Sequence, residues 1–481
     1  MNKTIQYILV GAVSLSALSL TSCNKFLDVQ PKGTLTEDVQ FSTYEGYIDA
    51  LYGVYGTMAT SSLYGSAMTY GYMDKLGQLF RKTNTGTEGE DPQFSSFNYS
   101  YPSIRQSGDN LWASLYKTIS YANNILRHVA APQFSDPRLQ RIQAEAYGLR
   151  AFLHLDVYRL FGPMDYAAHK SERLLPYSTT FNLENKDVYT HEQFLALILQ
   201  DLQQAEALMG EDETIRQDDV TDTEITKNRV VHFNKYALYA LYARVYSLMG
   251  NSEKANEYAS KVIAKFSLVE STKFASVRRF PAPGEMIFGL YAPKFLGDAQ
   301  AYFAVSELYG RADLEGKIYE AATATAGNRD ERYPAFYSNQ ALSGQGEQNK
   351  LIRFGATAAE IDRVPTSQRG ITILRLPEMY YIQAEARFRL GQTAEALESL
   401  NAVRRSRGLQ GLEASSISSL SDLKQQLLLE YIKEYPGEGQ VFFAMKRLQI
   451  PFTNYEGGTM QPSETIFVLP RPEAEQNYGK Q

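Results

Sequence analysis

The only cysteine of the chain, Cys23, ends the short run Leu20-Thr21-Ser22-Cys23. Before it come a positive residue, Lys3, and an uncharged stretch from Tyr7 to Leu20, which suits the apolar region of a signal peptide and is short for a membrane span. A bulky apolar residue, two small residues and a cysteine form a bacterial lipobox. The predicted chemistry is cleavage before Cys23 and acylation of its thiol and freed amine, which anchors the chain because each buried methylene contributes about 0.8 kcal/mol. The alternative is an ordinary secretory signal with a chance cysteine.

Aromatic side chains are the second group that could do chemistry, because the chain has 34 Tyr and 24 Phe but one Trp. Many lie in two stretches rich in Gly, Ser, Thr and Pro, at about 58–108 and 271–375. Tyrosine offers a flat face and a hydroxyl, which suit a sugar or a peptide. We predict that the ligand contacts Tyr70, Tyr72, Phe80, Arg81, Tyr99, Tyr291 and Tyr302. The alternative for each is packing in a secondary core beneath the loops.

The remaining titratable residues give no catalytic or metal-binding pattern. The five His residues are not spaced as a zinc-binding pair on a helix, and the sequence has no nucleophile elbow, phosphate loop or dinucleotide fingerprint. We therefore predict no catalytic residue, no metal and no cofactor. Carboxylates are plentiful, however, and a glycosidase needs only two of them about 5–10 Å apart. A helical glycoside hydrolase thus stays an alternative to a binding protein.

Several polar or aromatic residues lie within apolar helical patterns, where a site and a packed core are both open interpretations. The charged ones are Arg150, Asp156, Arg159 and Glu385, and the others are His154 and Trp112. An unpaired buried charge would cost several kcal/mol, so paired charges between packed helices are favoured over a polar site. A hydrogen-bonded core position is favoured for His154, and core packing over a sugar platform for Trp112.

Helical periodicity predicts the elements that position these residues. We expect a signal peptide at 1–22, a lipidated extended leader at 23–43 and one domain at 44–481, with helices at about 44–57, 109–162, 190–266 and 376–450. One helix is expected from about Asp136 to Phe161, and helices resume from Pro377 to about Arg407 and from Ser421 to about Leu448. The two irregular stretches would form ligand-face loops on this helical base.

An internal repeat supports that organisation. Residues 243–257 match residues 384–398, with a small residue, an aromatic, Gly at 250 and 391, a polar turn and then Ala. This is the signature of tetratricopeptide helix pairs. We expect a mostly α fold in which such pairs form a right-handed superhelix, with an irregular, short-stranded ligand-binding region.

The charge balance excludes one class of partner. The 481-residue chain has a formal net charge of −6 and no basic block, which argues against a nucleic-acid binder. After the signal peptide, no stretch approaches the roughly 18 uninterrupted apolar residues of a membrane span.

Seven motifs are spread along nearly the whole mature chain: Cys23–Gly33, Trp112–Lys117 with Ala122-Asn123, Leu149–Phe152, Tyr158–Pro163, Arg375–Ala386, Leu400–Arg404 and Val468–Glu473 with Asn477. Together and in this order they resemble one known family, the SusD/RagB outer-membrane nutrient-binding lipoproteins of Bacteroidetes. The stretch Leu429–Arg447 departs from the family pattern, since Pro436 and Gln440 are atypical there.

The resemblance implies a cell-surface carrier without catalysis. Members of the family cap a TonB-dependent transporter of the SusC type, capture oligosaccharides or peptides, and pass them to the barrel. For this chain it implies an oligosaccharide ligand, with a peptide ligand or a pure interaction scaffold as the alternatives.

Overall fold

The computed structural model describes residues 36–82, 89–211, 225, 228–277, 284–305, 307–321, 324–355 and 369–478. Cys23, the signal peptide and the leader up to Leu35 lie outside the described residues. Within the described part, no helix combines the length and the apolar character needed to cross a membrane.

Helices account for most of the described chain, as predicted. They are α2 (Glu37–Gln40), α3 (Tyr44–Met58), α4 (Tyr72–Leu76), α5 (Glu90–Ser95), α6 (Pro102–Val129), α7 (Leu139–Phe161), α8 (Tyr166–His169), α9 (His191–Met209), α10 (Lys235–Leu248), α11 (Ser252–Ile263), α12 (Ser271–Val277), α13 (Phe295–Val305), α14 (Arg332–Phe336), α16 (Leu376–Arg389), α17 (Thr393–Ser406), α18 (Leu420–Glu434), α19 (Val441–Leu448), α20 (Glu464–Phe467) and α21 (Glu473–Tyr478). Shorter turns are η2 (Arg229–Val231), η3 (Leu314–Ile318) and η6 (Ala414–Ser416).

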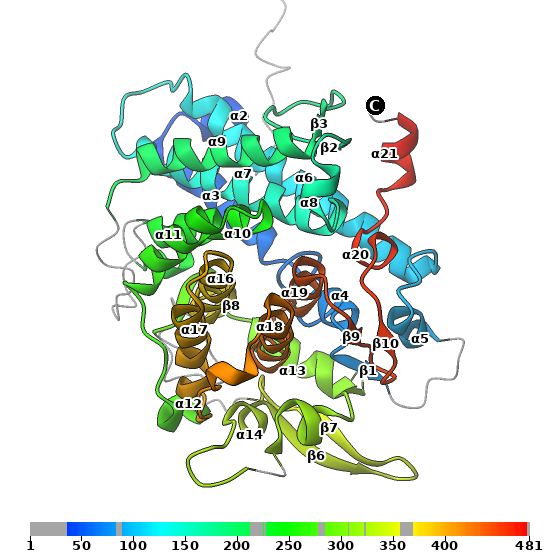
Figure 1. Ribbon diagram of the computed structural model, residues 1–481. Helices are drawn as coiled ribbons and strands as arrows, with labels where there is room; N and C mark the ends of the chain where they lie inside the picture. Colours follow the sequence, from blue (N-terminus) through cyan, green and yellow to red (C-terminus); the bar gives the residue numbers. More distant parts are fainter. Residues whose placement is uncertain are drawn as a thin grey trace, which may run out of the picture.

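The long helices pack against one another in a row. Contacts join α6 to α7, α7 to α9, α9 to α10, α10 to α11, α11 to α16 and α16 to α17. Figure 1 shows α6, α7, α9 and α10 together at one end of the molecule and α16 to α19 in its middle. This mostly helical arrangement of paired helices is the fold class that the repeat predicts.

Both copies of the internal repeat form the helix–turn–helix unit that their sequence predicts, α10–α11 and α16–α17. Gly250 and Gly391 end the first helix of each pair with φ of +76° and +78°, a conformation that glycine adopts without strain. In both turns the amide of the residue after the glycine donates, at 2.9 Å, to the carbonyl of the residue five positions earlier in the chain, as in a Schellman motif. Ala255 and Ala396, at matching positions in the second helices, are fully buried and allow close approach.

Strands join the two irregular stretches of the sequence. The strands are β1 (Phe80–Lys82), β2 (Arg173–Pro176), β3 (Val188–Thr190), β4 (Met286–Tyr291), β5 (Leu308–Gly310), β6 (Tyr337–Leu342), β7 (Gly346–Leu351), β8 (Gly370–Arg375), β9 (Phe452–Thr453) and β10 (Thr459–Met460). A four-stranded sheet has the order β1-β5-β7-β6, with Phe80 opposite Gly310, and its β6–β7 hairpin lies at the end of the molecule opposite α9 (Figure 1). Strand β4 pairs with β8 antiparallel.

Two predicted helix starts are wrong by several residues. Helix α6 begins at Pro102 rather than near residue 109, because proline is well suited to the first helical position. Helix α7 begins at Leu139 rather than Asp136, and the Asp136 carboxylate instead accepts a hydrogen bond from the backbone amide of Arg138 at 2.9 Å.

The helical range predicted from Ser421 to about Leu448 contains two helices. It is divided into α18 and α19 by a turn at Tyr435–Gln440. Pro436 disfavours a helical conformation at Tyr435, and Gly437 and Gly439 have φ of +88° and +68°. Gly437 and Glu438 of this turn line a cavity.

Candidate functional site

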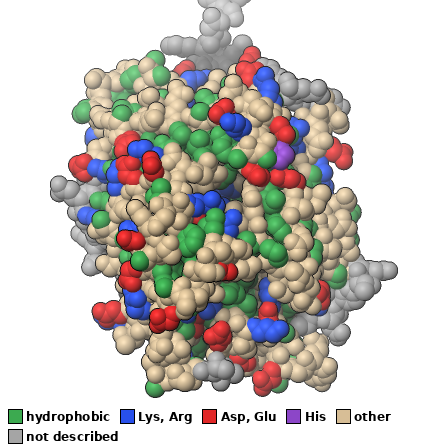
Figure 2. All heavy atoms as spheres, in the orientation of Figure 1, with side chains coloured by type: hydrophobic (Ala, Val, Ile, Leu, Met, Phe, Trp, Pro, Cys, Tyr) green, Lys and Arg blue, Asp and Glu red, His purple; other side chains and the backbone are tan. Residues whose placement is uncertain are grey.

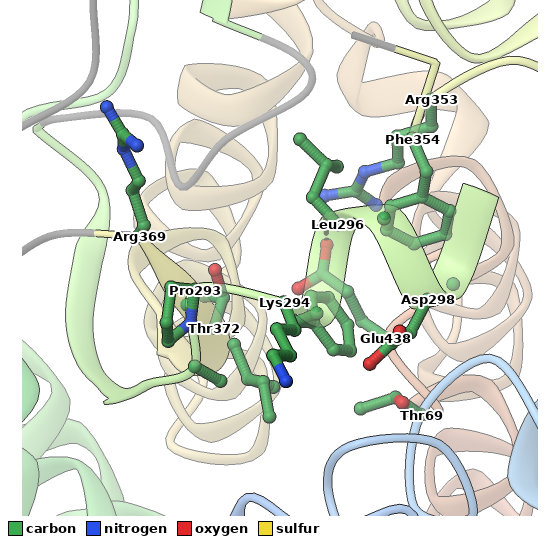
Figure 3. Close-up of a pocket in the computed structure, with 16 residues that line it drawn as sticks. Thr69, Pro293, Lys294, Leu296, Asp298, Arg353, Phe354, Arg369, Thr372 and Glu438 are labelled. Carbon is green, nitrogen blue, oxygen red and sulfur yellow. Dashed lines mark ion pairs between the residues drawn. The ribbon is translucent and has the colours of Figure 1, made fainter. Parts of the chain in front are cut away.

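A cavity of about 320 Å³, here called the α13 cavity, opens between the start of α13, strand β8 and the turn at Gly437–Gly439. Its wall includes Thr69, Ala292, Pro293, Lys294, Phe295, Leu296, Asp298, Arg353, Phe354, Ile371, Thr372 and Glu438. Figure 3 shows Lys294 and Thr372 across the space from Asp298, Glu438 and Thr69, with Arg369 turned away from them. Its volume is at the lower end of the roughly 300–1,000 Å³ typical of small-molecule sites.

Aromatic rings form the apolar side of the α13 cavity. The Phe295 and Phe354 rings meet edge to face with centroids 6.0 Å apart. Tyr70 packs beneath both, with its ring centroid 5.6 Å from Phe295 and 5.9 Å from Phe354. Tyr302 lies on the other side of Tyr70 at 5.1 Å. The two irregular stretches therefore meet here in one aromatic cluster.

Asp298 and Lys294 are exposed polar side chains in the first turn of α13 and the loop before it. Neither makes a hydrogen bond or an ion pair through its side chain with another described residue. Their carboxylate and ammonium groups are thus available to a ligand's hydroxyls. Together with the aromatic wall, they give the mixture of flat apolar surface and polar groups that small-molecule sites use.

Glu438 is held in the wall by two arginines, in contrast to Asp298. Its carboxylate pairs with Arg353 and accepts from Arg375 Nε at 2.8 Å. Arg353 also donates to the Pro436 carbonyl at 2.8 Å, so the turn that carries Glu438 is fixed from both sides. Glu438 therefore forms a rigid part of the wall.

Asp74 holds the same turn from below. Its carboxylate accepts from the amides of Gly437 at 2.5 Å and Gly439 at 2.8 Å. Burial raises the pKa of Asp74 to about 8, while these two amides act in the opposite direction. A side chain on Gly439 would meet the Met68 backbone at 2.1 Å, so glycine is required for this close approach.

Of the described residues that form the α13 cavity, none belongs to the seven predicted to contact a ligand. Tyr70 lies directly beneath it and Tyr302 beside Tyr70, while Tyr291 is 50% exposed next to Ala292 in the wall. Ligand contact by these residues stays a prediction.

The other predicted residues are engaged elsewhere in the structure. Tyr72 packs on Phe94, and Phe80 packs on Phe303 beneath the sheet. The Tyr99 hydroxyl donates to the Ile466 carbonyl at 2.6 Å. Arg81 pairs with Glu456 and lies over the Tyr455 ring. For Tyr72 and Phe80, both buried, the structure shows the secondary core that was the alternative interpretation.

Three of the residues for which a core role was favoured, His154, Arg150 and Trp112, are in the core. His154 is fully buried, accepts from the Ser178 amide at 3.0 Å and stacks on Tyr177. Arg150 forms a two-pronged ion pair with Asp201 at 2.7 and 2.6 Å. Trp112 packs between Tyr116 and Phe161. In the described part of the chain, no three His, Cys, Asp or Glu side chains are grouped to hold a metal ion.

Two family models together match nearly the whole chain. The model described as "SusD family" matches residues 244–480, and the one described as "Starch-binding associating with outer membrane" matches residues 25–247. The chain belongs to the SusD family. A SusD-like protein of Formosa agariphila is 22% identical over 439 residues, covering 82% of this chain and 80% of the relative. A second SusD-like protein of that organism is 25% identical over 360 residues, covering 73% and 64%.

Solved structures show the same family fold. A SusD superfamily protein from Bacteroides thetaiotaomicron matches with a TM-score of 0.71 at 21% identity, covering 91% of this chain and 98% of that one. A SusD-like carbohydrate binding protein from Bacteroides vulgatus matches with a TM-score of 0.68 at 18% identity, covering 90% and 96%. At such identities the match concerns the fold alone.

Sequence reasoning missed the residues of the turn at 435–440 and two charged residues near the start of α13, Lys294 and Asp298. One signal for the first was present, because Pro436 and Gln440 break the SusD family pattern in the region that builds the cavity wall. No comparable signal marks Lys294 or Asp298, since isolated charges in a loop are common on any surface.

Proposed function

We propose that this SusD family protein binds an oligosaccharide at the α13 cavity, while anchored to the outer membrane by acyl chains on Cys23. It would deliver the sugar to a TonB-dependent transporter of the SusC type and carry out no reaction of its own. The observation that carries the proposal is the aromatic pair Phe295 and Phe354 beside the polar groups of Lys294 and Asp298, which no other described residue engages. Sugar rings present CH faces that pack on such rings and hydroxyls that bond to such groups.

Binding is tested with the purified lipoprotein in detergent, screened against oligosaccharides and short peptides and then titrated calorimetrically with the best ligand. Asp298→Asn keeps the shape of the side chain and removes its charge. We expect about tenfold weaker binding, because hydrogen bonds to charged groups are stronger than neutral ones. Asp49→Asn, on the exposed face of α3, is the matched control and should bind as the wild type does.

The same samples distinguish binding from hydrolysis. Incubation with the bound glycan should release no new reducing ends, whereas a glycoside hydrolase would release them. Binding of peptides but of no glycan in the screen would argue for the peptide alternative. Equal affinity of Asp298→Asn and wild type would place the ligand away from the α13 cavity.

The anchor and the partner are tested in the membrane. Cys23→Ser should move the protein from the outer-membrane fraction to the soluble fraction, because acyl chains supply the anchor. Detergent extraction of the wild-type protein should co-purify a large outer-membrane barrel of the SusC type. Extraction of the protein alone, under conditions that keep other membrane complexes intact, would count against delivery to a transporter.

A further inference from the structure

A second cavity of about 260 Å³, here called the α19 cavity, lies between the end of α7, the α10–α11 turn, α16, α18 and α19. Figure 2 shows Lys and Arg side chains in a hollow near the middle of one face, over the region where α10, α16 and α19 approach one another in Figure 1. It is separate from the α13 cavity. A small gap of about 10 Å³ lies between the two cavities. Its lining includes Thr69, Thr372 and Glu438 of the α13 cavity and Arg159, Arg244 and Gln440 of the α19 cavity.

Positive charge exceeds negative charge in the wall of the α19 cavity. The six basic residues are Arg159, Arg244, Arg389, Lys424, Lys446 and Arg447. The three acidic ones are Asp165, Glu378 and Glu385, which leaves an excess of three. Asp156, outside the wall, pairs with Arg159 at 2.9 Å and reduces that excess to two. The whole chain has a net charge of −6, so this local excess is opposite in sign to the rest of the protein.

Part of this charge serves the packing of the helices. Arg244 and Glu378 form a two-pronged pair at 2.7 and 2.6 Å, which joins α10 to α16. Glu385 is shared by Arg389, at 3.0 Å, and Arg447. The pair of Glu385 with Arg447 joins α16 to α19, which is the structural role favoured for Glu385 from the sequence. Arg159 is paired too, but with Asp156 of its own helix.

Two lysines make no ion pair with a carboxylate of the described residues. Lys446 is buried and donates to the carbonyls of Arg159 at 2.9 Å and Gly162 at 2.7 Å, at the C-terminal end of α7, and its charged form has a third N–H for a ligand. Lys424, half-buried on α18, makes no ion pair with another described residue. Burial lowers the pKa of both lysines, so a bound anion would stabilise their charged forms.

Unused hydrogen-bond donors support the same conclusion. The hydroxyl of Tyr158, a residue that is 1% exposed, has no partner among the described atoms, and neither does the buried Nη2 of Arg447. Both residues belong to the wall of the cavity. Native proteins seldom leave such groups unsatisfied without a bound molecule. Apolar side chains, among them Met249, Ile382 and Phe443, complete the wall. They favour a ligand that has apolar surface of its own over a bare inorganic ion.

We propose that the α19 cavity is a second binding site of this protein, for an acidic sugar whose carboxylate or sulfate group meets these basic side chains. The apolar wall would receive the sugar ring, and the anion would take up the donors of Lys424, Lys446 and Arg447. The proposal goes beyond ligand capture at the α13 cavity and does not depend on it.

The test titrates the lipoprotein in detergent with D-glucuronate, glucose 6-sulfate and glucose. We expect one-site binding of at least one acidic sugar, weaker at higher salt, and no binding of glucose at the same concentrations. Glucuronate alone would assign a carboxylate ligand and the sulfate ester alone a sulfated one. Binding of none of the three, or equal binding of all three, would overturn the proposal.

Variants locate the site. Lys424→Gln, which breaks no ion pair, should weaken binding of the acidic sugar at least about tenfold. Arg389→Gln, whose side chain is 40% exposed, should weaken it as well. Lys117→Gln is the matched control, an exposed α6 lysine that also makes no ion pair among the described residues. Wild-type affinity in Lys424→Gln would overturn the proposal. A neutral oligosaccharide bound at the α13 cavity should bind equally in all three variants, which separates this result from that of the proposed function.

Discussion

Glu434 holds three arginine side chains in the interior of the protein. Its carboxylate accepts from Arg375 Nη1 at 2.7 Å, Arg407 Nη2 at 2.9 Å and Arg332 Nη1 at 3.2 Å. Glu434, Arg332 and Arg407 are completely buried. The arginines hold the pKa of Glu434 far below its ordinary value, against the effect of burial. Since Arg375 also binds Glu438, this group supports the wall of the α13 cavity.

Glu434→Gln should therefore destabilise the protein strongly. The glutamine keeps the size of the side chain but removes the carboxylate charge that three buried arginines share. Asp330, Glu438 and Glu285 then remain as their partners, and the loss of one buried counter-charge should cost about 3–5 kcal/mol. Denaturant unfolding measures this change in the free energy of unfolding. Glu398→Gln is the control, because its pair with Arg405 is 63% and 48% exposed and should contribute at most about 1 kcal/mol. An equal decrease in the free energy of unfolding in both variants would contradict the role of Glu434.

Lys446 gives the stability of the protein a dependence on pH. Burial lowers the pKa of Lys446 from 10.5 to about 7. At a pH between these two values, the lysine is protonated in the unfolded chain and has released its proton in the folded protein. The free energy of unfolding therefore rises with pH, by at most about 1.4 kcal/mol per pH unit. Below about pH 7 both states are protonated and this contribution is lost.

The prediction is tested by comparing the wild type with Lys446→Met at several pH values. The difference in unfolding free energy should shift in favour of the wild type as the pH rises from about 7 to 10.5. Lys117→Met, at an exposed lysine, should show no such shift relative to the wild type. A constant difference for Lys446→Met across this range would mean that the ammonium stays charged in the folded protein.

At the scale of elements, turns that depend on neighbouring residues were predictable from the sequence, whereas a turn that depends on a long-range contact was not. The turns at Gly250 and Gly391 follow from neighbouring residues, because a glycine, a polar cap and a spaced alanine act within one helix pair. The turn at Tyr435–Gln440 instead depends on Asp74, more than 360 residues away, whose carboxylate binds its amides. A single sequence shows the glycines there but not the partner that needs them.

Gly391→Ala tests the turn between α16 and α17. An added Cβ would meet nothing within 4 Å, so the expected loss of about 1–2 kcal/mol comes from the φ of +78° alone. Gly53 is the control, since it lies in α3 with equally open space and an ordinary helical conformation. Gly53→Ala should stabilise the protein by about 0.5–1 kcal/mol, because alanine restricts the unfolded chain. The midpoint temperatures of thermal unfolding of the two variants should thus shift in opposite directions from that of the wild type. A Gly391→Ala variant that is more stable than the wild type would contradict the role of the turn.

At the scale of the molecule, the two halves matched by the family models do not correspond to two packing units. Strand β1 from the first half completes the sheet of β5, β7 and β6, and α4 packs on α19. Phe152 of α7 meets Phe288 of β4 at 6.1 Å. The helical fold was predictable because periodicity and the repeat are local properties. The two cavities were not, because each wall gathers side chains from both halves.

Folding of the mature chain should therefore be cooperative, and the N-terminal half should not fold alone. A fragment of residues 23–247 would expose β1, the face of α4 that packs on α19, and the ring of Phe152, and would leave Asp74 without the amides of Gly437 and Gly439. We expect one calorimetric transition for the whole chain. The fragment should lack near-ultraviolet circular dichroism and a cooperative melt. A fragment that melts cooperatively near the temperature of the whole chain would show two independent domains, and each cavity would then have to be assembled by docking of preformed halves.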